Sequence, residues 1–224
     1  MSVADAISAR GFRESDGVED WRVLSDGAYA FFRTGSFAAA ARLAGAIGEL
    51  PGIDDHHPDV DLRRDGVTVR LITIEDDYFG MSGRDVDLAR RISALARDHG
   101  AAADTSSVQS YLVIPGAPQT AEVMPFWEAV LGYRRRDDSP EDDLVDPQDR
   151  GPGFWFERMD EPRPGGLGAI HVAVWVPGEH AEARVAAALA AGGHVVREQD
   201  APASWTLADA FGNEVDVATT ETRD

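Results

Sequence analysis

Apolar and polar positions in the first hundred residues alternate over four short segments and follow helical spacing elsewhere. Trp21–Leu24 and Ala28–Thr34 predict one pair of strands, and Asp59–Arg63 and Val67–Ile74 predict a second pair joined at Asp65-Gly66, a hairpin dipeptide. Apolar residues at helical spacing predict a helix before, between and after these pairs. The pattern is typical of an α+β domain.

Two of the predicted helices carry clear start signals. Ser36 is a predicted N-cap, and Pro51-Gly52 ends the helix that it begins. The apolar face of this helix is predicted to contain Phe37, Ala40, Ala44, Ile47 and Leu50. Ser82 and Asp85 have capping-box spacing at the next helix, where a carboxylate stabilises the first turn by roughly 1 kcal/mol.

The second part of the chain contains an internal repeat. The segment YLVIPG at Tyr111–Gly116 returns as AVWVPG at Ala173–Gly178, with an offset of 62 residues, and each copy predicts a strand, a helix and three strands. Repeats that cannot bury their apolar faces alone must pair, which predicts a cupped mixed sheet with a cavity for a small ligand. The small, polar segment Arg97–Ser107 separates the parts, so we expect domains at 1–100 and 105–224.

Composition excludes several classes of function. The chain has 224 residues, no Cys, and a net charge of −19, and its 21 basic residues are all Arg. Thiol catalysis, thiolate zinc sites and lysine Schiff bases are therefore excluded. The negative charge disfavours binding to nucleic acid or anionic lipid, and no segment predicts a signal peptide or a membrane span. We expect a cytoplasmic protein with a small-molecule partner.

Candidate chemistry lies first in the segment DDHHPDVD at Asp54–Asp61. Pro58 holds His57 in an extended conformation, so the side chains of His56 and His57 diverge and do not grip one metal ion. Two imidazoles at the end of a sheet suit an elimination, in which one protonates a leaving hydroxyl and the other accepts a proton. The alternative is an exposed turn without chemistry.

From Trp21 to about His99 the chain resembles the pterin-4a-carbinolamine dehydratase family. The matching residues are Trp21, the helix at Phe37, His56-His57-Pro58 and the predicted turn Gly80–Asp85. The resemblance implies a four-stranded antiparallel sheet with helices on one face, self-association into a homodimer or larger assembly, and dehydration of a 4a-hydroxytetrahydropterin without metal or cofactor. It implies that the catalytic residues are His56, His57 and Asp85. It also implies that the neighbouring Pro58 and Asp59 bind substrate.

Three positions depart from that family's pattern. Ile74 stands where the family has a third histidine, Gly52 where it has a charged residue, and Arg64 where it has an aromatic residue. Asp76 lies in a slightly longer segment and is positioned to replace the missing histidine. Because a missing acid–base group costs about 10²–10⁴ in rate, the substitution at Ile74 predicts slow turnover.

From about Val108 to Thr219 the chain resembles the vicinal-oxygen-chelate superfamily, which includes glyoxalase and bleomycin-resistance domains. The matching segments are PFWEAVLGY, GFWFERMDEPRP, IHVAVWV and DAFGNEVDV. The resemblance implies paired βαβββ repeats and a divalent-metal set: His171, Gln109 by the 62-residue offset, and Glu157 and Asp216 from the last strands of the repeats. Trp155 and Trp175 are candidates for binding substrate, with an aromatic core as the alternative.

Three functions follow from these patterns. The first is a carbinolamine dehydratase (a hydro-lyase), weakened by Ile74. The second is a metal-dependent glyoxalase or dioxygenase-like enzyme run by the second part of the chain. The third is a non-catalytic protein that binds a small ligand.

Overall fold

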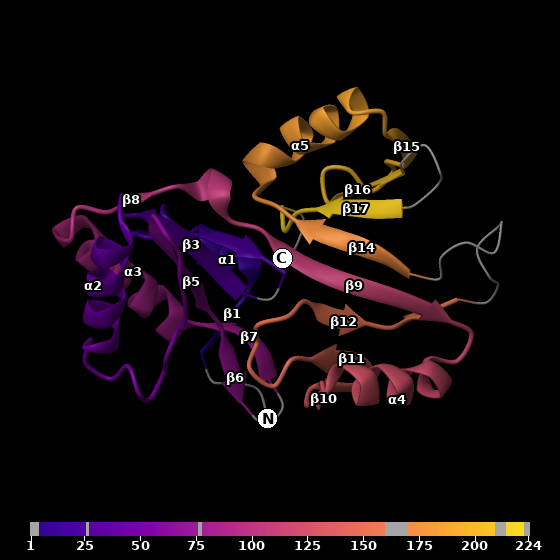
Figure 1. Cartoon of the computed structure of the whole chain (residues 1–224), viewed down its shortest axis with the longest axis horizontal. Coiled ribbons are helices and arrows are strands. Elements are labelled where there is room, and N and C mark those ends of the chain that lie inside the picture. The colour runs from indigo at the N-terminus through magenta and orange to yellow at the C-terminus, as the bar shows by residue number, and fades with distance from the viewer. Residues whose placement is uncertain (1–4, 26, 76–77, 160–169, 209–213, 222–224) are drawn as a thin grey trace. The chain divides into compact units, whose positions relative to one another are not determined.

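The computed structural model describes residues 5–25, 27–75, 78–159, 170–208 and 214–221. The chain forms two compact units (Figure 1). Unit 1 comprises Met1–Gln109 with Thr220–Asp224, and unit 2 comprises Ser110–Thr219. Within the described residues, no helix is both long enough and apolar enough to cross a membrane.

Unit 1 contains two antiparallel sheets and three α-helices among its described residues. One sheet has the order β2-β3-β5-β4, with short β8 beside β3, and the other has the order β1-β7-β6. The elements are β1 (Ala6–Ile7), α1 (Ala9–Arg13), β2 (Arg22–Leu24), β3 (Gly27–Arg33), α2 (Phe37–Gly48), β4 (Asp59–Leu62), β5 (Gly66–Leu71), β6 (Thr73–Glu75), β7 (Tyr78–Ser82), α3 (Gly83–Asp98), β8 (Ala102–Ala103) and a 3₁₀ turn (Thr105–Ser107).

The core of unit 1 joins the sheet to α2 and α3, which lie on the same side of β3 and β5 (Figure 1). Alternate residues of the two strands enter this core because successive side chains of a strand point to opposite faces. The buried residues are Ala28, Ala30 and Phe32 of β3, Val67, Val69 and Leu71 of β5, Ala40, Leu43 and Ile47 of α2, and Val86, Ala89 and Ile92 of α3.

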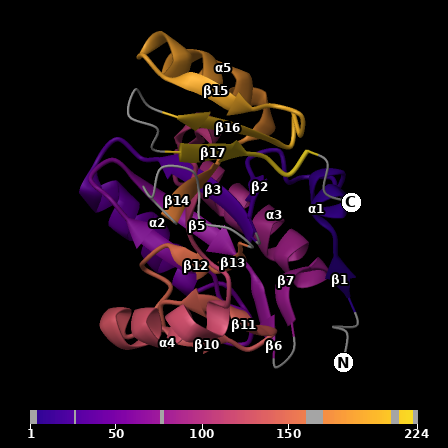
Figure 2. The ribbon, with the colours of Figure 1, turned by 90° about the vertical axis from the view of Figure 1, so that its right-hand side faces the viewer.

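Three local features differ from the sequence-based prediction. Phe37 is 57% exposed because it is the first residue after the Ser36 cap, outside the buried stripe of α2. The predicted strand Val67–Ile74 is divided between β5 and β6, which belong to different sheets. Part of the predicted turn Gly80–Asp85 forms strand β7, which pairs with β6, as Figure 2 shows, and with β1.

Unit 2 repeats the order strand, helix and further strands. Its elements are β9 (Ser110–Ala117), α4 (Thr120–Leu131), β10 (Arg134–Arg136), β11 (Ser139–Val145), β12 (Gly153–Trp155), β13 (Glu157–Arg158), β14 (Ile170–Trp175), α5 (Gly178–Ala190), β15 (His194–Arg197), β16 (Ser204–Ala208) and β17 (Glu214–Ala218). The strands lie in the order β10-β11-β12-β9-β14-β17-β16-β15, with β13 paired to β9.

The two repeats meet at β9 and β14, which are antiparallel. Each of these strands also runs parallel to a late strand of its own repeat, β12 or β17. Helix α4 lies along β10 and β11, and α5 lies along β15 to β17 (Figure 1). Each half therefore has its own apolar core, one around Met124 and Phe154 and the other around Val185 and Trp205.

The adjacent residues Thr219 and Thr220 belong to different units. Thr219 belongs to unit 2, where its hydroxyl donates to the carbonyl of Pro202. Thr220 belongs to unit 1: its hydroxyl donates to the carbonyl of Val23, and it accepts two hydrogen bonds from Arg13. The contacts of the described residues therefore put Thr219 in unit 2 and Thr220 in unit 1.

Candidate active site

His56 lies in the turn between α2 and β4. Gly52 adopts a left-handed conformation with a φ of +75°, which glycine accommodates without a steric penalty. The backbone N–H of His56 donates to the carbonyl of Gly52 over 3.3 Å. Glycine at this departure from the family pattern therefore fits the backbone of the turn that carries the histidine.

The imidazole of His56 contacts the first turn of α3. Its Nε2 lies 2.8 Å from Oδ1 of Asp85. The carboxylate is fully buried, and the histidine side chain is 15% exposed. The structure thus brings together two predicted site residues that are 29 positions apart in the sequence.

The second oxygen of Asp85 is held by two neighbouring residues. Oδ2 accepts from the backbone N–H of Ser82 over 2.7 Å, which completes the capping box, and from the hydroxyl of Thr73 over 2.7 Å. The hydroxyls of Thr73 and Ser82 are also 2.7 Å apart. The capping box is visible in the sequence, but the role of Thr73 is not, because the pairing of β6 with β7 has no signal in the local pattern.

His57 has a different environment from His56. His57 is exposed, and its imidazole makes no hydrogen bond to the residues that the structure describes. Pro58 follows in an intermediate environment and leads into β4. The two adjacent imidazoles therefore differ in role: that of His56 is fixed by a buried carboxylate, and that of His57 reaches solvent.

Asp59 is engaged by an arginine on the neighbouring strand. Its Oδ2 lies 3.2 Å from Nη1 of Arg70, opposite it in the β4–β5 register. The guanidinium of Arg70 also lies 5.9 Å from the ring centroids of Tyr29 and Phe79. The carboxylate predicted to bind substrate is thus neutralised by a cation that also contacts two aromatic rings.

Ile74 lies at the edge of the site. It follows Thr73 in β6, pairs with Phe79 of β7, and is 42% exposed. An exposed isoleucine neither donates nor accepts a proton, so the position supplies no acid–base group. Asp76, the predicted replacement, lies outside the described residues.

Tyr78 is a further polar residue near Asp85 that sequence analysis did not identify. Its hydroxyl donates to the carbonyl of Met81 over 2.5 Å. Burial raises the pKa of Tyr78, and the negative charge of Asp85 raises it further. The phenol is therefore a neutral donor under ordinary conditions, and its hydrogen bond lies within β7.

Unit 2 contains a second pair of a histidine and an aspartate. Nε2 of His171 lies 3.2 Å from Oδ2 of Asp216, and the hydroxyl of Thr206 donates to Oδ1 of the same carboxylate over 2.6 Å. Burial raises the pKa of Asp216, but the hydrogen bonds from His171 and Thr206 outweigh it, so the net pKa lies below the usual range. The carboxylate is thus an ionised acceptor held by two neighbours.

The structure does not assemble the predicted metal set. Ile114 lies opposite His171 in β9, whereas Gln109 precedes Ser110, which pairs with the far end of β14. Glu157 lies in β13, opposite Gly116. Among the described residues, no group of three or more His, Cys, Asp or Glu side chains is arranged to hold a metal ion. The described donors therefore do not fit a metal centre.

The tryptophans of unit 2 divide between core and surface. Trp205 is buried in the core beneath α5, and Trp127 packs on Phe154 with ring centroids 5.4 Å apart. Of the two proposed to bind substrate, Trp155 is 39% exposed in β12, and Trp175 is partly buried at the end of β14. The aromatic-core alternative thus describes Trp205 and Trp127, and Trp155 remains available to a ligand.

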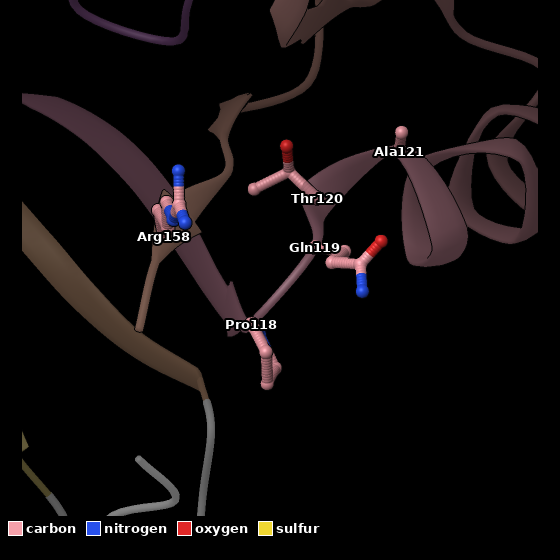
Figure 3. A pocket seen from close by; sticks show the side chains of 5 residues that line it. All are labelled: Pro118, Gln119, Thr120, Ala121 and Arg158. Atoms are coloured by element: carbon pink, nitrogen blue, oxygen red, sulfur yellow. The ribbon is translucent and has the colours of Figure 1, made fainter. Parts of the chain in front are cut away.

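Unit 2 also has an open pocket of about 520 Å³ at the start of α4 (Figure 3). The side chains that line it are Pro118, Gln119, Thr120, Ala121 and Arg158. None of the residues predicted to act in catalysis or metal binding lines this pocket.

Two family models match the chain, one in each unit. Residues 5–95 match the family described as pterin 4 alpha carbinolamine dehydratase, and residues 112–218 match the family described as a glyoxalase-like domain. These matches define a dehydratase-type domain joined to a glyoxalase-like domain, and the latter implies a vicinal-oxygen-chelate fold.

Curated relatives match the first of these domains. A protein of Nocardia farcinica named "Putative pterin-4-alpha-carbinolamine dehydratase" is 40% identical over 78 residues, which cover 35% of this chain and 80% of the relative. A protein of Acidobacterium capsulatum with the same name is 39% identical over 59 residues, or 26% of this chain and 62% of the relative. The chain belongs to the pterin-4a-carbinolamine dehydratase family.

One solved structure has a weaker likeness to this chain. An NAD-dependent benzaldehyde dehydrogenase from Legionella pneumophila is 14% identical, with a TM-score of 0.36, and the match covers 49% of this chain and 97% of the other. A likeness of this size bears on neither fold nor function.

The donor geometry of unit 2 generates a test with metal ions. We expect excess Zn²⁺ or Mn²⁺ to leave the melting temperature of unit 2 unchanged, because a ligand stabilises a fold only when it binds the native state. Differential scanning calorimetry and elemental analysis after desalting measure this. Stoichiometric metal that is lost in both His171→Ala and Asp216→Asn would contradict the expectation.

Proposed function

We propose that unit 1 dehydrates a 4a-hydroxytetrahydropterin to a quinonoid dihydropterin. The observation that carries this proposal is the 2.8 Å contact between His56 and the buried carboxylate of Asp85, in a chain that belongs to the dehydratase family. The reaction breaks the C–O bond at position 4a and an N–H bond of a neighbouring ring nitrogen. A C=N bond forms, and the hydroxyl leaves with a proton as water.

The two histidines divide this work. His57 acts as the general acid and base, because its imidazole is exposed and histidine is a side chain that can both give and take protons. His56 orients the substrate, because Asp85 fixes the direction of its ring. Neither role requires a metal or an organic cofactor. We assign substrate binding to Pro58 and Asp59, which lie next in the chain.

Ile74 is the reason that we expect a low turnover rate. The family resemblance places a third imidazole at its position, and its absence leaves one proton-transfer step without an assisting group. A second candidate function follows from the same observation: unit 1 binds a pterin and releases it unchanged. We do not propose a metal-dependent reaction for unit 2, because its described donors do not assemble into a metal centre.

Substitution of His57 tests the assignment of the general acid and base. We expect the full-length protein to accelerate dehydration of a 4a-hydroxytetrahydropterin, and His57→Ala to lower kcat by about 10²–10⁴-fold. Stopped-flow absorbance follows the quinonoid product. His99→Ala is the matched control, because His99 is also an exposed histidine of unit 1. An equal loss in both variants, or no loss in His57→Ala, would contradict the assignment.

Substitution of Ile74 separates slow catalysis from binding alone. We expect Ile74→His to raise kcat about tenfold or more, because it restores an acid–base group beside the site. Ile74→Gln is the control, since it adds a polar side chain that does not titrate. If the unmodified protein and Ile74→His both bind a pterin analogue and neither dehydrates the substrate, the binding function is supported instead.

A further inference from the structure

We propose that Thr73, together with Ser82, is a positioning residue that fixes the proton of His56 on Nε2 and turns Nδ1 toward the substrate. This inference rests on the proposed function of unit 1 and assigns the orientation of its imidazole. It follows from the hydrogen bonds around Asp85, which are independent of the family resemblance.

The carboxylate of Asp85 divides its two oxygens between different partners. Oδ2 is held by the backbone N–H of Ser82 and by the hydroxyl of Thr73, each over 2.7 Å, and Oδ1 is left for His56. The backbone N–H belongs to the junction of β7 and α3 and cannot rotate away. The carboxylate plane is therefore set by groups other than the histidine.

The two hydroxyl protons can be placed by counting donors. Each hydroxyl has one proton, and Thr73 uses its proton on Asp85. The hydroxyl of Ser82 lies 2.7 Å from Oγ1 of Thr73 and 3.3 Å from Oδ2 of Asp85, so the shorter contact assigns the proton of Ser82 to Thr73. Both residues are buried, at 1% and 0% exposure, so water does not compete for these bonds. The result is a directed chain from Ser82 through Thr73 to Asp85.

The direction of this chain fixes the state of His56. All of the hydrogen-bond partners found for Asp85 donate to it, so Nε2 of His56 must carry the proton that it shares with Oδ1. In the neutral imidazole, Nδ1 is then the acceptor. Nδ1 has no hydrogen-bond partner among the residues that the structure describes. It is free to accept a hydrogen bond from a ring N–H of the substrate.

Thr73 and Ile74 are adjacent in β6, but their side chains have different environments. Adjacent side chains of a strand point to opposite faces, and here Thr73 is buried while Ile74 is 42% exposed. The substitution that removes the third imidazole therefore leaves the support of Asp85 intact. The chain retains the machinery that orients His56 even where it lacks the family's third histidine.

The test reads the tautomer of His56 directly. Long-range ¹H–¹⁵N spectra of the full chain, assigned by loss of signals in His56→Gln, identify which ring nitrogen is protonated. We expect the Nε2–H form in the unmodified protein and in Thr73→Ser, and a mixture of tautomers in Thr73→Val. We also expect kcat to fall about tenfold to a hundredfold in Thr73→Val and to be regained in Thr73→Ser. Thr68→Val in β5 is the matched control.

Each outcome bears on one claim. An Nδ1–H form in the unmodified protein, or a folded Thr73→Val with an unchanged spectrum, would overturn the inference whatever the activity. If Thr73→Val does not fold by circular dichroism, Ser82→Ala takes its place, since it removes the hydroxyl and keeps the backbone N–H. If the spectra behave as expected but no variant dehydrates the substrate, the positioning stands and the proposed function fails.

Discussion

The candidate site of unit 1 depends on one buried carboxylate. A charge without exposure to water is costly unless its oxygens are satisfied, and Asp85 satisfies them with a backbone N–H, a hydroxyl and an imidazole. These three partners come from the end of β7, from β6 and from the turn before β4. The same interaction therefore begins α3, joins a short sheet to it, and sets the direction of His56.

Local sequence signals predict several element boundaries of unit 1. Ser36 and Ser82 mark the starts of α2 and α3, and Asp65-Gly66 marks the turn between β4 and β5. The resemblance puts His56 and Asp85 in one catalytic set, but it does not predict their contact, because no local pattern joins residues 29 positions apart. Thr73 was missed for the same reason, since its neighbour Ser82 is brought to it by strand pairing.

In unit 2 the repeat was visible in the sequence, but the geometry between its copies was not. Antiparallel strands related by a repeat bring equivalent residues close together only near the centre of the pair, where Leu112 lies opposite Ala173, one position from its equivalent Val174. Away from that centre, equivalent residues move apart in opposite directions. The offset that pairs Gln109 with His171 in the sequence therefore does not make them neighbours, and His171 instead contacts Asp216.

The most direct measurement is a crystal structure of the full chain with a bound dihydropterin. We expect a ring N–H of the pterin to lie about 3 Å from Nδ1 of His56, with Nε2 still on Asp85 and His57 facing position 4a. A pterin bound away from both histidines, or an imidazole of His56 turned away from Asp85, would contradict this expectation.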